Sequence, residues 1–212
     1  MPKEKKAKKV VEKQMVEIEA PEYKVMTVDL LGTNPLVTNR PPVGGISRKK
    51  KEAGVDKPLP TMDEQFEAHK HYLSDKRSLG IPAVALHNAL QQACTTLNAA
   101  ASKAGVRRNV TVFPHDMPTG LLKIDDGKCR QWTRDIPQKG GFGTSLPTSS
   151  PQFWPWTIKN VRIQFSGYSD KGMATIVAAA GRSIGIGSAR KVNSSLSCGT
   201  FDIKNVRVAK LA

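Results

Sequence analysis

Residues 159–181, KNVRIQFSGYSDKGMATIVAAAG, contain a strand pattern that is followed directly by a helix pattern. Val161 and Ile163 alternate with polar side chains, which is the period of a half-buried β-strand. Ser169 stands where a helix N-cap is expected, and apolar residues then recur at helical spacing until Gly181, which is well placed to end the helix. The stretch therefore predicts a strand and a helix that pack on one core.

Patterns of the same two kinds occur elsewhere along the chain. They predict strands over residues 24–31, 108–112 and 201–208, a helix over residues 82–97 that Gly105 closes, and a bulge at Lys204 and Asn205 in the last strand. The predicted order is strand, helix, strand, strand, helix, strand. This is the βαββαβ plan of a ferredoxin-like or RNA-recognition-motif-like (RRM-like) core, so the predicted fold class is α+β.

Long connections and a basic arm surround this predicted core. Residues 1–20 hold six lysines and little to bury, which predicts a flexible basic arm in front of a single domain over residues 21–212. Two insertions are predicted in that domain, at about residues 38–75, with a short helix at 62–73, and at residues 114–156. The glycines and prolines of the second insertion argue against a regular core element, although a hairpin fits within it.

The charge of the chain points to a polyanionic partner. Among 212 residues, 33 Lys and Arg against 18 Asp and Glu give a formal net charge of +15, which is more than solubility requires. The three cysteines show neither a disulfide nor a zinc-site spacing, and no secretory signal or membrane span is recognisable. We therefore predict a soluble protein without metal or cofactor in the reducing cytoplasm of a prokaryotic or phage-infected cell.

The most informative segment for function is residues 181–201, GRSIGIGSARKVNSSLSCGTF. Glycines let a backbone approach a phosphate chain closely, and Arg182, Arg190 and Lys191 add positive charge beside them. The segment lacks the GxxxxGK[ST] spacing of a P-loop and lies between a helix and a strand, the reverse of the order in a nucleotide-binding site. The alternative interpretation is a turn in which glycines only let the chain reverse its direction.

Basic residues lie mainly in the predicted loops, from which they can converge on one groove. Trp132, between Arg130 and Arg134, is a candidate for stacking on a base, or else an anchor of the insertion to the core. Anchoring is the preferred interpretation for Trp154 and Trp156. The residues predicted to bind nucleic acid are Arg40, Arg48, Lys49, Lys50, Lys51, Arg77, Arg107, Arg108, Arg130, Trp132, Arg134, Gly181, Arg182, Gly185, Gly187, Arg190 and Lys191.

Three segments are similar to the RAMP superfamily, the RNA-binding proteins of CRISPR effector complexes. Residues 28–36, VDLLGTNPL, resemble the opening strand and turn of that family, and residues 80–90, GIPAVALHNAL, resemble the IPGSSLKGALR start of its first helix. Residues 181–201 resemble its glycine-rich loop before the last strand. The chain departs from the family at residues 83–85, where Ala-Val-Ala replaces small polar residues, and at residues 87–88, where His-Asn replaces Lys-Gly.

The resemblance implies a backbone-type subunit that lines up along single-stranded RNA or DNA. In that arrangement residues 114–156 would form a thumb-like projection that contacts the neighbouring subunit or the strand. Several phage-encoded proteins also look similar in the Gly-Ile-Pro and Gly-Ile-Gly segments, so the predicted origin includes a phage-encoded relative.

Taken together, these features predict a non-catalytic protein that binds single-stranded RNA or DNA and multimerises along the strand as a filament or backbone subunit. Its predicted partners are the strand, further copies of itself in head-to-tail contact, and other subunits of a nucleoprotein complex. One alternative is a metal-independent ribonuclease of the RAMP type, for which His87 is the candidate, although a polar residue on the solvent face of a helix is the simpler interpretation of His87. Another alternative is a basic structural or assembly protein of a phage or nucleoprotein particle.

Overall fold

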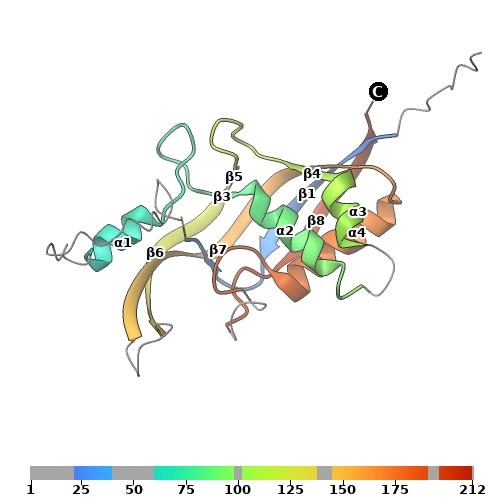
Figure 1. Cartoon of the computed structure of the whole chain (residues 1–212). Helices are drawn as coiled ribbons and strands as arrows, with labels where there is room; N and C mark the ends of the chain where they lie inside the picture. The colour runs from blue at the N-terminus through green and yellow to red at the C-terminus, as the bar shows by residue number, and fades with distance from the viewer. Residues whose placement is uncertain (1–21, 40–59, 98–101, 138–144, 191–195, 212) are drawn as a thin grey trace, which may run out of the picture.

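A six-stranded antiparallel sheet forms the centre of the molecule, and four of its strands lie in the order β8, β1, β7, β4 (Figure 1). The computed structural model describes residues 22–39, 60–97, 102–137, 145–190 and 196–211. The four core strands are β1 (Lys24–Gly32), β4 (Val110–Phe113), β7 (Ser145–Phe165) and β8 (Phe201–Lys210). With helices between β1 and β4 and between β7 and β8, this order is compatible with the predicted ferredoxin-like core. The α+β fold class is confirmed.

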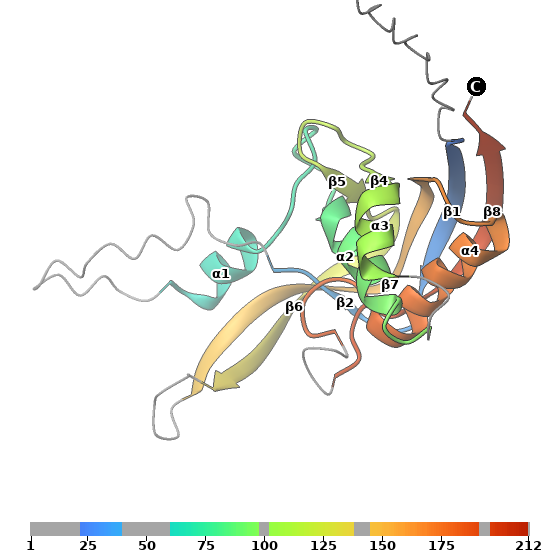
Figure 2. The ribbon, with the colours of Figure 1, turned by 45° about the vertical axis from the view of Figure 1, so that its right-hand side comes forward.

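Three helices cover one face of this sheet (Figures 1 and 2), namely α2 (Ala83–Ala93), α3 (Lys103–Asn109) and α4 (Asp170–Ala179). On the sheet side of the core, Met26, Val28 and Leu30 of β1 are fully buried. Leu86 and Leu90 of α2 are buried in the same core. Burial of one such side chain contributes about 1.5–3 kcal/mol. Strand β1 and helix α2 therefore stabilise each other through this shared core.

Two helix ends differ from the sequence-based predictions. Helix α2 ends at Ala93, and Gly105 lies in the first turn of α3, where its N–H donates to the N-cap Ser102 Oγ at 2.9 Å. Ser102 therefore starts a separate helix. Helix α4 does not end at Gly181 but continues as a π-helical turn, η1 (Ala180–Ile184), which Gly185 closes with a φ of 75°. In the described ranges no helix is long and apolar enough to cross a membrane.

The other face of the four core strands carries a row of polar and basic side chains. Arg162 of β7 pairs with Thr27 on one side and with Phe113 on the other, and Thr27 pairs in turn with Arg207 of β8. The Arg162 guanidinium carbon lies 5.5 Å from the centre of the Phe113 ring. We call the surface around Arg162 and Arg207 the open sheet face, since the three helices lie on the opposite side (Figure 2).

Asp29 joins the bulges of the two strands that flank β1. Asn160 of β7 and Asn205 of β8 have positive φ angles of 56° and 52°, at the points where the two registers shift. The Asp29 carboxylate accepts hydrogen bonds from the Asn160 N–H and from Asn205 Nδ2, both at 2.7 Å. These two hydrogen bonds lower the pKa of Asp29 below its ordinary value of 3.8. The bulge predicted at residues 204–205 is confirmed.

We expect Asp29→Asn to lower the free energy of unfolding at neutral pH by about 1–2 kcal/mol, because a charged acceptor shared by two donors is lost. The folded pKa lies below the unfolded one, so the wild type holds this stabilisation above the unfolded pKa and loses it as the pH falls through the folded pKa. The difference between the two proteins should therefore shrink below about pH 4. Urea unfolding at neutral and acidic pH measures this, and a difference independent of pH would contradict a role for the Asp29 charge.

Strand β7 is 21 residues long and takes part in two ladders. Its C-terminal part pairs with β1 and β4, whereas its N-terminal part pairs with β6 (Asp126–Pro137) as a hairpin. This hairpin projects from the core in both views (Figures 1 and 2). A hairpin is thus present within residues 114–156, and its second strand continues past residue 156 into the core sheet without a break.

The prolines of β7 are compatible with a strand because of the side toward which they face. The N–H and C=O of one strand residue point to the same side, and the Pro151 carbonyl accepts the Thr38 N–H at 3.0 Å on the side away from β6. Pro147 lies four residues earlier and has the same orientation. The missing N–H groups of Pro147 and Pro151 therefore cost the β6–β7 ladder no hydrogen bond.

Helix α1 (Met62–Ala68), shorter than the predicted helix at 62–73, covers this edge of β7 beyond the two-residue strand β2 (Leu36–Val37). It begins with a capping box between Thr61 and Glu64. The Ser149 N–H donates to Gln65 Oε1 at 3.2 Å, and His69 Nδ1 lies 2.7 Å from the Ser149 carbonyl oxygen. The helix therefore supplies partners to backbone groups that an uncovered strand edge would leave unpaired.

A separate two-stranded sheet lies at the start of α2. It pairs β3 (Gly80–Pro82) with β5 (Leu121–Lys123). The Ala83 N–H donates to the Gly120 carbonyl oxygen at 3.0 Å, so this small sheet fixes the position where α2 begins.

Candidate nucleic-acid interface

One face of the β6–β7 hairpin carries alternating basic and aromatic side chains. Side chains two positions apart on a strand share a face. Directly opposite residues of an antiparallel pair also share a face, and Trp154 of β7 is opposite Lys128 of β6. The basic and aromatic side chains on this side, called the hairpin face below, are Lys128, Arg130, Trp132, Arg134 and Trp154.

Lys128, Arg130 and Trp154 are exposed on the hairpin face. Among the described residues, no carboxylate forms an ion pair with either cation. Trp154 has 44% of its surface exposed, so the prediction that it anchors the insertion is wrong, whereas Trp156, which is 1% exposed, is an anchor as predicted. The two differ because the register shift between β6 and β7 falls beside them and interrupts the alternation.

Trp132 connects the hairpin face to the glycine-rich segment. Its ring is half-buried and packs against a small cluster of Val37, Ala189 and Cys198. The Arg134 guanidinium carbon lies 5.1 Å from the ring centre on this face. These contacts give Trp132 an anchoring role, and they place Ala189 and Cys198 of the glycine-rich segment directly against the hairpin.

The glycines of that segment are required by contacts within the protein. Gly187 has a φ of 85°, and a Cβ there would clash with the Val37 carbonyl oxygen. A Cβ on Gly199, whose φ is 71°, would clash with the Ile186 carbonyl oxygen, and one on Gly185 would lie 2.8 Å from the Cys198 carbonyl oxygen. The chain therefore folds tightly on itself here, and a contact of Gly181, Gly185 or Gly187 with a phosphate stays a prediction.

The second RAMP-like segment meets the third at a pocket of about 340 Å³. Pro82 and Ala85 line it from the first turn of α2, and Gly187 and Ser188 line it from the glycine-rich segment. The positive end of the α2 dipole lies at this position. The remaining lining residues are Thr38, Asn39, His71 and Ile81.

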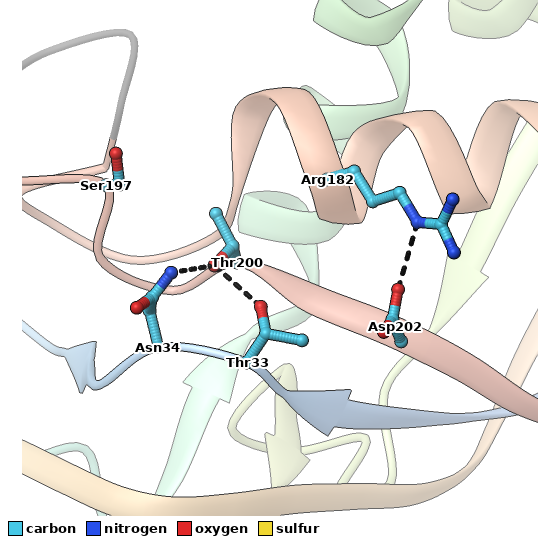
Figure 3. A pocket seen from close by; sticks show the side chains of 6 residues that line it. All are labelled: Thr33, Asn34, Arg182, Ser197, Thr200 and Asp202. Carbon is cyan, nitrogen blue, oxygen red and sulfur yellow. Dashed lines mark hydrogen bonds and ion pairs between the residues drawn. The ribbon is translucent and has the colours of Figure 1, made fainter.

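A second pocket, of about 390 Å³, lies where the first and third RAMP-like segments meet (Figure 3). Its lining side chains are all polar, and they are Thr33, Asn34, Arg182, Ser197, Thr200 and Asp202. The predicted site residue Arg182 donates from Nε to Asp202 Oδ1 at 3.0 Å. We call this the polar pocket.

The structure does not bring every predicted residue to the hairpin. Arg107 and Arg108 lie in the last turn of α3, since β4 begins at Val110 and not at residue 108, and α3 lies away from the hairpin (Figures 1 and 2). Arg77 lies in a turn where its N–H donates to Asp75 Oδ1 at 2.8 Å. Arg190 is half-buried. Outside the described residues lie the predicted arm over 1–20 and Arg40, Arg48, Lys49, Lys50, Lys51 and Lys191.

His87, the candidate of the ribonuclease alternative, is half-buried in α2, and among the described residues its Nε2 atom has no hydrogen-bond partner. His87 Nδ1 lies 3.3 Å from Gln91 Nε2 of the same helix. Burial raises the pKa of the Cys94, Cys129 and Cys198 thiols, which keeps them protonated and weakly nucleophilic. Within the described ranges, no group of three or more His, Cys, Asp or Glu side chains is arranged to hold a metal ion.

Sequence reasoning left Trp154 and most of the polar pocket out of the site. The alternation of residues 128–134 was the available signal for the hairpin face, because a strand of that period places Lys128, Arg130 and Trp132 on one side. Thr33, Thr200 and Asp202 of the polar pocket carry no such signal, because they come together only when β1 and β8 pair.

The comparisons with known proteins show a likeness to solved structures only in fold, not in sequence. No protein-family model matches this chain, and no curated protein matches it. Among solved structures, it is similar to a chain in the cryo-EM structure of the Type III-B Cmr-beta bound to cognate target RNA, at 13% sequence identity and a TM-score of 0.46. The superposition covers 90% of this chain and 62% of the other, so the chain spans less than two thirds of the length of that structural neighbour.

Proposed function

We propose that this protein binds single-stranded nucleic acid without cutting it, and that the hairpin face is the main contact. The observation that carries the proposal is the combination of exposed Lys128 and Arg130, neither in an ion pair with a described carboxylate, and exposed Trp154 opposite Lys128. Unpaired cations on a regular strand suit a phosphate chain, and an exposed indole suits a base.

The exposed aromatic side chain favours a single strand over a duplex. A base stacks on an indole only when its own face is uncovered, which is the case in single strands and not inside a helix. Such stacking is worth about 1–3 kcal/mol per base and tolerates any sequence. Binding by the hairpin face is therefore expected to depend weakly on base identity.

The charge of the segment between Asn39 and Pro60 supports the same proposal. The segment at residues 40–59 contains six Lys and Arg against two acidic residues. The chain enters that segment after Asn39, which lines the pocket at the start of α2, and leaves it before Thr61, the N-cap of α1. Both ends are thus held close to elements that contact β7.

The finer part of the proposal is that copies of the protein line up along one strand in head-to-tail contact. Strand β6 is 12 residues long and, among the described residues, pairs only with β7, so its other edge is able to accept a neighbouring chain. The projection of the hairpin from the core gives such a contact its reach (Figure 2).

Affinity for a single-stranded oligonucleotide should fall steeply with salt. Each neutralised phosphate contributes a slope of about −0.7 in log affinity against log salt, so contacts from Lys128 and Arg130 alone give about −1.4, and flanking basic residues steepen it. Fluorescence anisotropy between about 50 and 200 mM salt measures the slope, with a duplex of the same sequence as control. A flat response, or tighter binding of the duplex, would overturn the proposal. The same titration on a long strand, followed by light scattering, tests the assembly, and strictly monomeric complexes at saturation would contradict it.

A further inference from the structure

One side of the polar pocket is held by hydrogen bonds within the protein, and the other side has hydrogen-bonding groups without partners among the described residues (Figure 3). On the first side, Thr33 Oγ1 and Thr200 Oγ1 are 2.8 Å apart, and Asn34 Nδ2 donates to Thr200 Oγ1 at 2.7 Å. Thr200 is 6% exposed, so these hydrogen bonds anchor the turn after β1 to the start of β8. This half of the pocket is held in place before any ligand arrives.

On the other side, Arg182 and Asp202 form an ion pair that uses only some of their hydrogen-bonding groups. Only Nε of Arg182 and Oδ1 of Asp202 are engaged, at 3.0 Å. In the described part of the chain, the two terminal amino groups of Arg182 and the Oδ2 atom of Asp202 have no partner. Their side chains are 75% and 48% exposed, so one cationic donor and one anionic acceptor face solvent side by side.

The backbone fixes this juxtaposition. Gly181 packs directly on Phe201, because a Cβ at residue 181 would clash with the Phe201 carbonyl oxygen. The next residue on each segment is Arg182 and Asp202, respectively. The π-helical turn η1 therefore sets the guanidinium beside the carboxylate by a backbone contact as well as by the ion pair.

The chemistry of the lining selects a class of ligand. The pocket has no aromatic or large apolar side chain, so it offers nothing on which a base can stack. Its volume of about 390 Å³ lies within the range of small-ligand sites, which is about 300–1,000 Å³. A neutral acceptor set of hydroxyl and amide oxygens, with one carboxylate and one guanidinium, matches the hydroxyls of a sugar next to a phosphate.

The polar pocket and the hairpin are linked through two neighbouring residues. Ser197 lines the pocket, and the next residue, Cys198, belongs to the cluster that packs on Trp132. The pocket is therefore fixed relative to Trp132 of the hairpin face, on which the strand is proposed to lie.

We propose that the polar pocket holds one ribonucleotide of the bound strand and that Asp202 accepts a hydrogen bond from its ribose 2′-hydroxyl, while Arg182 binds the adjacent phosphate. This inference rests on the proposed binding of a single strand and goes beyond it by naming the strand as RNA. The 2′-hydroxyl is the group by which a protein distinguishes RNA from DNA at a given site. DNA offers no donor to Oδ2 of Asp202, the oxygen that Arg182 leaves free.

The test compares a short oligouridine with its 2′-deoxy and 2′-O-methyl counterparts, binding to the full chain and to two variants. We expect the wild type to prefer the RNA by about tenfold, the size of one hydrogen bond to a charged group, over both counterparts, which lack the 2′ O–H donor. Asp202→Ala should bind the RNA and the DNA equally, because the acceptor that distinguishes them is lost. The matched control is Asp170→Ala, which also removes an exposed carboxylate paired with one cation, Lys24, at 2.9 Å.

Asp170 is a suitable control because it lies at the first turn of α4, about 18 Å along the helix axis from Arg182 at 1.5 Å per residue. It should keep the RNA preference of the wild type. The inference is overturned if the wild type binds RNA and DNA equally, or if Asp202→Ala, shown to be folded by its melting curve, keeps the preference. If neither oligonucleotide binds in a salt-dependent way, the proposed function itself fails, which is a different result from equal binding of the two.

Discussion

Replacing Lys128 and Arg130 together by glutamate should lower affinity for a single-stranded oligonucleotide by at least about a hundredfold. Each removed cation costs a charge-assisted hydrogen bond to phosphate, worth about 1.5–3 kcal/mol, and each new carboxylate repels the strand. Both side chains are exposed and neither is in an ion pair with a described carboxylate, so the fold should be retained. Arg134 is left unchanged because it packs over Trp132. Anisotropy titration at low salt measures the effect.

The matched control is the double variant Arg162→Glu and Arg207→Glu on the open sheet face. It changes the net charge by the same amount and also alters two exposed strand residues. If the hairpin face is the main contact, this control should lose only the part of the affinity that comes from overall charge, a small fraction of the hairpin effect. A larger loss in the control than in the hairpin variant would move the binding site to the open sheet face.

Gly199→Ala should lower the free energy of unfolding by about 2–5 kcal/mol. A left-handed backbone costs a residue with a Cβ about 1–2 kcal/mol, and forcing a methyl group into a packed contact adds about 1–3 kcal/mol. At Gly199 both apply, because φ is 71° and the Cβ would clash with the Ile186 carbonyl oxygen. For a chain of this length, the expected drop in Tm is about 10 °C. A thermal melt measures it.

Gly120→Ala separates the two contributions. Gly120 has a φ of 69°, but a Cβ there would have nothing within 4 Å. This variant should therefore lose only the backbone part, about 1–2 kcal/mol. Equal losses in the two variants would show that the tight folding of the glycine-rich segment adds nothing to stability.

The core could be predicted from the sequence because its signals are local. The alternation in β1 and the Ser169 cap of α4 each depend on a few neighbouring residues, and the structure has both. The bulge at Asn205 could be predicted for the same reason, since a break in the alternation marks it directly. The partner that holds it, Asp29, is 176 residues away and gave no signal.

The extent of β7 could not be predicted, because prolines in a sequence indicate a break in a strand unless the side on which the strand is paired is known. Pro147 and Pro151 are tolerated only because β6 lies on the other side. The same limit applies to the site. Trp154 is exposed and Trp156 buried because of a register shift, although strict alternation would place both on one face. The polar pocket depends on Gly181 meeting Phe201 across two segments.

Because β7 is continuous from the hairpin into the core sheet, a small rotation of the strand in the core displaces the far end of the hairpin by a much larger distance. From residue 157 to residue 145 the strand spans about 40 Å at about 3.3 Å per residue, and no loop interrupts it. A change of about 5° in the direction of β7 within the core would therefore move the far end, at Pro137 and Ser145, by about 3–4 Å. Tension on that end is transmitted directly to the hydrogen bonds between β7 and its core neighbours β1 and β4. In an assembly of such chains, the spacing of adjacent copies would thus be set by the twist of the sheet in each one.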